Sequence, residues 1–490
     1  MTSVLERSTL MKTQAYVGGK WIGSDSGATF PVYDPATGDR IADVPRMGTA
    51  ETRRAIEAAN AALPGWRATP AKERAKIIRR WYELMLEHTD ELAHIMTLEQ
   101  GKPLAESRGE IAMGAAYVEW NAEEAKRVYG DTIPTLGNDR RMVTIKQPIG
   151  VCVGITPWNF PHAMVTRKAS PALAAGCTFV LKPAEQTPLS ALAVAELAEQ
   201  AGIPPGVFNI VTGDADDAPV IGGEMTSNPI VRKLGFTGST VVGKLLMEQC
   251  ARTVKKVSLE LGGNAPFIVF DDADIDAAVS GAMGAKFRNA GQVCVSPNRL
   301  YVQSGVHDKF VEKLTARVQK LRAGNGFEEG VTLGPLIEEQ GFSKVVEHVE
   351  DACNRGATVV HGGKPHQLGR TFYEPTILTN VTPAMRLSNE ETFGPVAAIA
   401  SFDTEADVIA MANDTPFGLA SYFYSRDIGR VWRVAEALET GMVGINTPLI
   451  ANESIPFGGI KESGIGREGS KYGIDEWVEI KYMCFGGIDK

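Results

Sequence analysis

The chain alternates between short runs of β-branched or apolar residues and longer stretches with helical periodicity. Residues 143–145, 150–155 and 179–181 are runs of the first kind, and residues 190–201 repeat apolar side chains at the spacing of an amphipathic helix. Strands that alternate with helices of this length are typical of an α/β fold.

The clearest such unit begins at residue 178. TFVLK (178–182) predicts a strand, LSALAVAELAEQAG (189–202) a helix, and VFNIV (207–211), after a Pro-Pro-Gly turn, a second strand. We expect these strands to be parallel with a right-handed crossover. A further strand at 231–236 and a helix at 240–250 complete half of a dinucleotide-binding sheet.

A second α/β region follows Gly262 and Gly263. APFIVF predicts a strand, and the acidic run at 272–276 suits the N-terminus of the next helix. Residues 130–147 and EWVEIKYM (476–483) alternate apolar and polar positions, as strands with one covered face do. Such strands often complete a sheet across a subunit interface, which predicts a homo-oligomer, a dimer or a tetramer.

Composition supports a folded enzyme with several domains. The chain has 490 residues, 22% of them charged and 44% hydrophobic. Its formal net charge of -9 makes nucleic acid and anionic membranes poor candidate partners. No apolar run approaches the roughly twenty residues of a membrane helix, and the N-terminus lacks the apolar core of a secretory signal. We therefore expect a cytoplasmic protein.

The six cysteines lie far apart, without a C-x-x-C pair, so we expect neither a metal site nor structural disulfides. Cys294 stands out because it follows Gly291 and Gln292 in a turn-rich segment, where a thiol can meet a substrate. Most cysteines are instead small buried apolar residues. That is the expectation for Cys152, Cys177, Cys250, Cys353 and Cys484.

Two further segments carry candidate chemistry. In VSLELGGNAP, Glu260 lies between leucines, where a carboxylate is costly to ionise and its pKa should rise toward that of a general base. A buried salt bridge is the alternative. In ITPWNFP, two prolines stiffen the turn around Asn159, whose amide could donate to an oxyanion. Asn more commonly bonds its own turn.

Two segments are candidates for cofactor binding. LGFTGSTVVG (234–243) combines a strand, a glycine turn and a helix start, so Ser239 and backbone N–H groups can face a pyrophosphate. It lacks the GxGxxG fingerprint. Residues 182–185 end the strand TFVLK, where open α/β sheets bind nucleotides, and Glu185 can accept both ribose hydroxyls.

These segments occur together in an order that resembles the aldehyde dehydrogenase superfamily. PWNFP, LKPAE, FTGST, LELGG, GQVC, EETFGP and PFGGIKESGIGRE are similar to that family's signature segments, from about Tyr16 to near the C-terminus. FPHAMVTRKASPALAAG, KFRNAGQVC and REGSKYGIDEWVEIKYMC are most similar to its succinate-semialdehyde dehydrogenase branch. The resemblance implies a Rossmann-type NAD-binding domain (1–128 and 149–261), an α/β catalytic domain (262–470) and a small β oligomerisation arm (129–148 and 471–490).

The resemblance also implies roles for individual residues. Cys294 is the nucleophile, Glu260 the base that activates water to cleave the thioester, and Asn159 with the Cys294 N–H the oxyanion hole. Cofactor contacts are expected from Trp158, Lys182, Pro183, Ala184, Glu185, Gly238, Ser239, Leu261, Glu391 and Phe393. Glu185 lies where the 2′-phosphate of NADP would sit, so NAD should be preferred.

For the substrate, Arg167 and Arg288 match arginines that hold the far carboxylate in the branch. Two positions depart from it, because Pro448 and Ala451 stand where the branch commonly has Gly and a carboxylate-binding Ser. Succinate semialdehyde is the first expectation, and glutarate semialdehyde, 2-oxoglutarate semialdehyde and sulfolactaldehyde are the alternatives. A cysteine esterase or hydrolase would also use Cys294 with a base, but the nucleotide segments argue against it.

Overall fold

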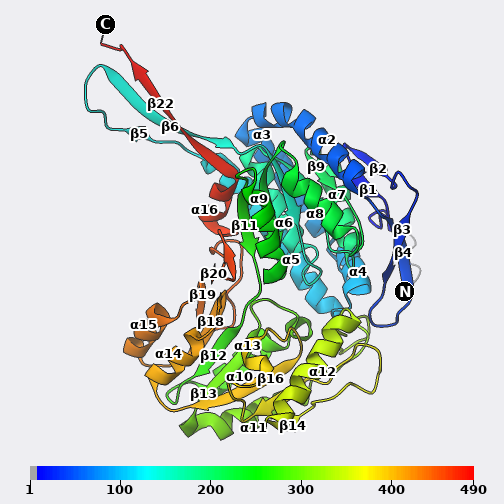
Figure 1. Cartoon of the computed structure of the whole chain (residues 1–490), viewed down its shortest axis with the longest axis vertical. Helices are drawn as coiled ribbons and strands as arrows, with labels where there is room; N and C mark the ends of the chain where they lie inside the picture. Colours follow the sequence, from blue (N-terminus) through cyan, green and yellow to red (C-terminus); the bar gives the residue numbers. More distant parts are fainter. Residues whose placement is uncertain (1–7, 490) are drawn as a thin grey trace.

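The computed structural model describes residues 8–489, so residues 1–7 and residue 490 of the expected domain ranges lie outside it. Two large sheets of mainly parallel strands form the body, and a small antiparallel sheet projects from one end (Figure 1). The α/β class predicted from the sequence is confirmed. Among residues 8–489, no helix is long and apolar enough to span a lipid bilayer.

The first sheet has eight strands in the order β2-β1-β9-β8-β7-β10-β11-β21. The strands are, in this order, Lys20–Ile22, Ala15–Val17, Phe208–Ile210, Thr178–Lys182, Val151–Ile155, Val231–Thr237, Lys256–Glu260 and Gly464–Ile465. The five from β9 to β11 are parallel. The chain order reverses between β7 and β10, and such reversals create a ligand crevice at the carboxyl ends of the strands. Strand β21 lies inside the range 262–470 but joins this sheet.

The predicted βαβ unit is confirmed. Helix α7 (Pro188–Gln200) joins the parallel strands β8 and β9. The helix begins with a proline, and Glu99 accepts hydrogen bonds from the N–H groups of Leu189 and Ser190 at 2.8 and 2.7 Å. These bonds satisfy N–H groups that have no partner within the helix.

Both faces of the first sheet are covered. Val151 and Val153 of β7 pack into one cluster with Ile56, whereas Cys152 between them packs into another with Leu173. The strand is therefore apolar at successive positions, as in sheets that are buried on both sides. The helices of this half are α2 (Thr49–Ala68), α3 (Ala71–Glu87), α4 (Thr89–Gln100), α5 (Leu104–Glu124), α6 (Ala163–Ala175), α7, α8 (Ala218–Ser227) and α9 (Thr240–Ala251).

The second sheet has seven strands in the order β14-β15-β16-β13-β12-β18-β19. Their bounds are Thr358–His361, Thr376–Thr379, Val396–Phe402, Pro297–Gln303, Ala265–Val269, Ala420–Tyr424 and Met442–Ile445. Its helices are α10 (Ile275–Lys286), α11 (His307–Val318), α12 (Glu339–Asn354), α13 (Arg386–Asn389), α14 (Glu405–Asn413) and α15 (Ile428–Ala437). The predicted acidic start of α10 is confirmed, because Asp274 accepts the N–H of Ala277.

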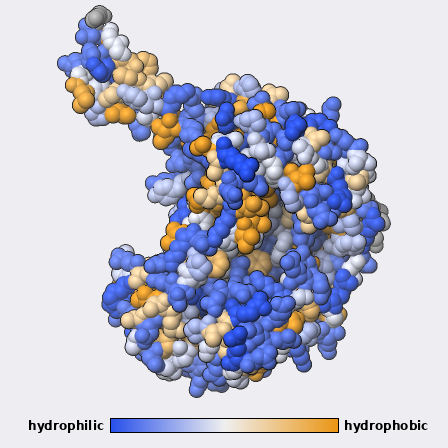
Figure 2. Space-filling model, viewed as in Figure 1, coloured by the Kyte–Doolittle hydropathy of each residue, from blue (hydrophilic) through white to orange (hydrophobic). Residues whose placement is uncertain are grey.

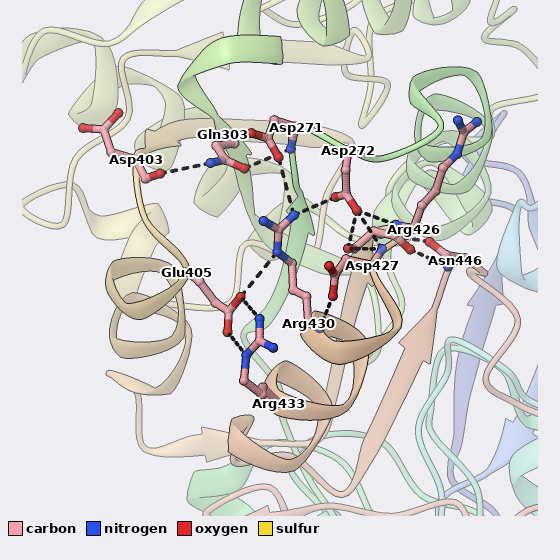
Figure 3. Close-up of polar contacts among 11 residues, drawn as sticks. Asp271, Asp272, Gln303, Asp403, Glu405, Arg426, Asp427, Arg430, Arg433 and Asn446 are labelled. Carbon is pink, nitrogen blue, oxygen red and sulfur yellow. Dashed lines mark hydrogen bonds and ion pairs between the residues drawn. The ribbon is translucent and has the colours of Figure 1, made fainter.

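The carboxyl ends of the second sheet are filled by the protein's own charges (Figure 3). Arg430 of α15 reaches Asp272, after β12, at 2.7 Å and Glu405 of α14 at 3.3 Å. Cys294 precedes β13 and so lies toward the opposite, amino edge. Strand β11 leads through Gly262 and Gly263 into β12, so the amino edge of the second sheet meets the carboxyl edge of the first.

The projecting sheet consists of β22 (Val478–Gly486), β6 (Arg140–Pro148) and β5 (Thr132–Ile133). The alternating stretch 130–147 thus holds two strands, because residues 134–139 form the connection between them. The expectation of one covered face is wrong for the single chain. Ile480, Tyr482 and Phe485 of β22 are 69%, 54% and 51% exposed.

The charge cluster of Figure 3 predicts a stability effect that leaves the chemistry unchanged. Asp272 accepts the N–H groups of Arg426 and Asp427, each at 2.8 Å, and the Ser425 hydroxyl at 2.9 Å. Asp272→Ala should lower the free energy of unfolding by about 1–2 kcal/mol.

These hydrogen bonds lower the pKa of Asp272 despite partial burial, so the stabilisation should be complete above the pKa of an unfolded aspartate and lost as the pH falls through the lower folded value. Urea unfolding at several pH values measures this difference. Asp271→Ala is the matched control, because Asp271 meets Arg430 at 3.4 Å and is half exposed. Equal losses in the two variants would contradict this account.

Candidate active site

Cys294 follows a tight turn that requires its glycine. Asn289 and Ala290 both have left-handed backbone angles, and Gly291 has φ +76°. A Cβ on Gly291 would lie 2.1 Å from the carbonyl oxygen of Gly394. The predicted turn-rich setting is therefore confirmed, and close packing fixes it against a distant segment.

The end of β11 passes directly beside the cysteine. A Cβ on Gly263 would lie 2.6 Å from the Cys294 carbonyl oxygen, and one on Gly458 would lie 3.0 Å from Oε1 of Glu260. The glycines of LELGG and PFGG therefore let these backbones approach the site. Cys294 also packs beside the apolar cluster that contains Phe160 and Phe457.

Glu260 is a buried carboxylate. Within residues 8–489 its Oε2 has no hydrogen-bond partner, and no cation pairs with it. Burial, reinforced by the charge of Glu468, raises its pKa well above the usual range. The predicted rise in pKa is confirmed, and the salt-bridge alternative finds no partner in this part of the chain.

Burial also raises the pKa of the Cys294 thiol, to about 12. The negative charges of Glu391 and Glu260 add to this rise, and the cations Arg167 and Arg288 oppose it. The thiol is therefore protonated near neutral pH in the cofactor-free protein. The fields of these four side chains set how readily it ionises.

Asn159 is held away from its own turn. Its Nδ2 donates to the Gln292 carbonyl at 3.1 Å, which uses one of the two amide hydrogens. The backbone carbonyl oxygen of Asn159 accepts hydrogen bonds from Nζ of Lys102 at 2.7 Å and from Nδ2 of Asn289 at 3.0 Å. In the described part of the chain the Cys294 N–H donates to no protein acceptor. Both expected oxyanion donors thus keep a hydrogen available.

Sequence reasoning missed the buried ion pair behind this turn. Lys102 Nζ lies 2.6 Å from Glu110, whose other oxygen accepts the N–H groups of His162 and Ala163. The pair anchors the turn to α5 and to the loop that precedes it. No local pattern marks these residues, because the contact joins segments about fifty residues apart in the chain.

A cleft of about 980 Å³ opens at the carboxyl ends of β7, β8 and β10, where the chain order reverses. Six of the ten predicted cofactor residues line it, namely Trp158, Lys182, Ala184, Glu185, Gly238 and Ser239. Pro183, Leu261, Glu391 and Phe393 do not. The Phe393 ring meets Trp158 edge-on at 5.5 Å, and Glu391 accepts the Gly263 N–H at 3.2 Å, so these two lie between the cleft and Cys294.

The cleft fits a dinucleotide. Lys182 Nζ is 3.5 Å from Oε2 of Glu185, so an ammonium donor and a carboxylate acceptor lie side by side on the cleft lining. A Cβ on Gly238 would lie 2.5 Å from the Phe236 ring, so this position before α9 needs a glycine, and its N–H donates to the Glu260 carbonyl at 3.0 Å. Ser239 caps that helix by accepting the Val242 N–H. A capped helix N-terminus beside a glycine favours a phosphate group.

The two arginines lie in different environments. Arg167 is buried, pairs with Glu468 at 2.8 Å, and has its guanidinium over the rings of Phe457 and Tyr117. Lys168 also pairs with Glu468. Burial opposes the charge of Arg167, but Tyr117 and Glu468 raise its pKa above the ordinary value. Arg167 therefore forms a buried salt bridge within the chain.

Arg288 is exposed and lies over the Phe160 ring at 5.3 Å, and no carboxylate in the described residues pairs with it. Ala451 packs beside the same apolar cluster as Cys294. Arg288, Ala451 and Cys294 thus border one region of the structure. The motif PFGGIKESGIGRE contained Glu468, but its charge gave no sign that it would reach Arg167.

All six cysteines are free thiols. Cys152, Cys177 and Cys250 are buried as expected. The expectation is wrong for Cys353 and Cys484, which are exposed in the last turn of α12 and on the uncovered arm.

The chain matches the model of the Aldehyde dehydrogenase family over residues 21–483. It is 65% identical to a glutarate-semialdehyde dehydrogenase of Pseudomonas aeruginosa, over 99% of this chain and all of that protein. It is 63% identical to an NADP(+) succinate-semialdehyde dehydrogenase of Escherichia coli, over 98% of this chain and 99% of that protein. It is 60% identical to a 3-sulfolactaldehyde dehydrogenase of Pseudomonas putida, over 99% of each chain.

A solved structure shows the same agreement. The crystal structure of a succinate-semialdehyde dehydrogenase from Burkholderia pseudomallei is 61% identical and superposes with a TM-score of 0.97, covering 98% of this chain and 99% of that chain. The fold and site define a nucleotide-dependent oxidoreductase with a cysteine at its centre. The chain belongs to the aldehyde dehydrogenase family.

The charges around Cys294 predict the reactivity of the thiol without cofactor. Glu391→Gln removes a charge that raises the Cys294 pKa, so alkylation by iodoacetamide at a given pH should become faster. Arg288→Ala removes a cation that lowers it, so alkylation should become slower. Peptide mass spectrometry between pH 7 and 10 must follow Cys294 itself, because the exposed thiols of Cys353 and Cys484 react with iodoacetamide as well. Rates that change in the opposite directions would contradict the account.

Proposed function

We propose that the protein oxidises a small aldehyde with an anionic tail to the carboxylic acid, through a thioester on Cys294. Succinate semialdehyde is the first candidate. The observation that carries this proposal is the grouping of a thiol, a buried carboxylate of raised pKa and an arginine that pairs with no carboxylate of residues 8–489, beside a dinucleotide-sized cleft. The names of the relatives support the substrate class and include glutarate semialdehyde and sulfolactaldehyde as rivals.

The protein's own groups perform most of the chemistry. Cys294 first loses its thiol proton to water, and the thiolate sulfur then attacks the aldehyde carbon. The Cys294 N–H and the free amide hydrogen of Asn159 stabilise the resulting oxyanion. A bound nicotinamide supplies the acceptor for the hydride of that carbon. Glu260 then takes a proton from water, which attacks the thioester and releases the acid. A carboxylate of raised pKa suits this proton transfer.

The acyl-enzyme tests this assignment. Cys294→Ala should abolish oxidation while NAD still binds. Glu260→Gln should release one equivalent of NADH and then stall, because hydride transfer precedes attack by water. Intact-protein mass spectrometry should show the acyl adduct in this variant. Turnover in Cys294→Ala, or no adduct in Glu260→Gln, would overturn the roles.

Arg288 is the first candidate for binding the substrate tail, and Arg167, which already pairs with Glu468, is the second. An arginine that binds a buried anion contributes several kcal/mol, whereas an exposed salt bridge contributes about 1 kcal/mol or less. Arg288→Ala should therefore raise KM for carboxylate-tailed aldehydes by about a hundredfold and leave KM for a neutral aldehyde almost unchanged.

Arg167→Ala should also lower the unfolding midpoint, because it removes a buried partner of Glu468. Ala451→Ser adds a hydroxyl beside the apolar cluster next to Cys294. If the native substrate has another tail, this variant should raise kcat/KM for succinate semialdehyde and not for the other aldehydes. If kcat/KM is unchanged and succinate semialdehyde is already the best wild-type substrate, the result favours succinate semialdehyde over its rivals.

We propose NAD as the preferred cofactor, supported by Glu185 and Lys182 together on the cleft lining. A carboxylate there can accept ribose hydroxyls and repels a 2′-phosphate. Glu185→Ser should narrow the ratio of kcat/KM for NAD over NADP by at least about tenfold. Equal wild-type constants would refute the preference. The Escherichia coli relative is named for NADP(+), so measuring both cofactors with this protein decides whether it shares that preference.

The domain division given by the sequence, with residues 129–148 and 471–490 as an oligomerisation arm, also remains a proposal. Apolar side chains gather on the arm and near the centre of the body (Figure 2). Tyr482 and Phe485 of the arm are about half exposed, and so are Leu245 and Met247 of α9. Exposed apolar surface of this kind favours assembly into a dimer or tetramer.

A further inference from the structure

The turn that carries Glu391 and Phe393 is held by residues with no part in the proposed chemistry. Phe393 has a left-handed backbone, with φ +57°. A Cβ on Gly394 would lie 2.4 Å from the side chain of Val345 on α12. The turn therefore lies directly against that helix.

His348, one turn further along α12, bonds the residues on both sides of Glu391. Its Nε2 lies 3.2 Å from Oε2 of Glu390, and its Nδ1 lies 3.2 Å from Oγ1 of Thr392. The side chain is wholly buried, and burial lowers its pKa, so the ring is neutral near pH 7. A carboxylate can only accept, so Nε2 carries the hydrogen and Nδ1 accepts from the Thr392 hydroxyl.

The carboxylate on this histidine is fixed as well. Arg386 of α13 bonds Glu390 at 3.1 Å and holds the pKa of that carboxyl below its usual range. Glu390 is therefore charged and accepts from both partners. The orientation of the His348 ring is determined by an acceptor on one nitrogen and a hydroxyl donor on the other.

Asn298 fixes the backbone of the same turn from the cysteine side. It lies near the start of β13, four residues after Cys294. Its Oδ1 accepts the Thr392 N–H at 3.1 Å, and its Nδ2 donates to the Glu390 carbonyl at 2.8 Å. Glu391 thus lies between two neighbours that are each held twice, through the backbone by Asn298 and through side chains by His348.

Glu391 itself has little to orient it. Its hydrogen bond from the Gly263 N–H is 3.2 Å long. Burial raises the pKa of Glu391 to about 7, so near neutral pH the carboxylate takes up a proton readily and its negative charge contributes little to holding it in place. A carboxylate with so few contacts depends on its neighbours for its position.

We propose that His348 is a positioning residue that holds Glu391 and Phe393 toward the nicotinamide end of the cofactor. This inference rests on the proposed function, because it takes Glu391 as a contact of the nicotinamide riboside. His348 touches neither the cleft lining nor the reacting atoms. Its effect passes through the side chains of Glu390 and Thr392.

The test compares NAD binding, by isothermal titration calorimetry without aldehyde, in five variants of the full chain. His348→Ala removes both bonds and should raise the Kd for NAD about tenfold or more, because the turn loses the side-chain contacts on both sides of Glu391. His348→Gln can still donate to Glu390 and should recover most of the affinity. Val349→Ala is the matched control, because it removes buried volume from the next position of α12 and should change Kd by less than about twofold.

Amide hydrogen exchange of residues 387–394 in the cofactor-free protein gives a second readout. Exchange should accelerate in His348→Ala and not in Val349→Ala. If His348→Ala does not fold, Thr392→Val removes the hydroxyl at nearly constant volume, and it should raise Kd severalfold.

Glu391→Gln separates this inference from the proposed function. If that variant binds NAD as well as the wild type, the role of Glu391 fails. If it binds weakly while His348→Ala and Thr392→Val bind like Val349→Ala, the role of Glu391 stands and the inference about His348 is overturned.

Discussion

The burial of ionisable groups where the two sheets meet is the constraint on which this site depends. Cys294, Glu260 and Glu468 all lose solvent there, and burial disfavours the charged form of each. Glu468 alone among these three regains its charge, because Lys168 and Arg167 pair with it and lower its pKa. Its charge in turn raises the pKa of Glu260. The negative charge of Glu468 thus helps to raise the pKa of Glu260 toward the range that suits a general base.

The same constraint shapes the thiol. A cysteine with a pKa near 12 is almost wholly protonated at neutral pH and is a weak nucleophile until a nearby group takes its proton or a cation draws closer. Two carboxylates and two arginines act on it from different segments of the chain. The strands position these groups because β11 runs into β12 through Gly262 and Gly263. A side chain at 263 would collide with the Cys294 carbonyl, and one at 262 would crowd the Glu391 carboxylate. The glycines are therefore part of the electrostatic arrangement.

Much of this could be predicted from the sequence, because some signals are local. The strand-helix-strand pattern at 178–211, the cap of α10 and the glycine turn before Cys294 each depend on residues close together in the chain. The apolar neighbours of Glu260 also predicted its raised pKa. The family resemblance ordered these pieces into one site, and the comparisons with known proteins agree with it.

What could not be predicted depends on contacts between distant segments. Lys102 reaches Asn159, and Glu110 reaches His162, across about fifty residues. Glu468 reaches Arg167 across about three hundred. His348 has no local pattern that distinguishes it from any other histidine on an amphipathic helix. The turn at 134–139 was missed because alternation continues on both sides of it. The exposure of the arm was also missed, because alternation of apolar and polar residues does not say whether either face of a strand is covered within one chain.

We propose that this site selects aldehydes with an anionic tail, which Arg288 binds. The most direct test is the wild-type kcat/KM with NAD for aldehydes of matched length that carry carboxylate, sulfonate or uncharged amide tails, measured at one ionic strength. The account predicts that at least one anionic tail exceeds the amide by about a hundredfold, because Arg288 is left without a partner when the tail is neutral. Equal constants for the charged and uncharged tails would contradict it.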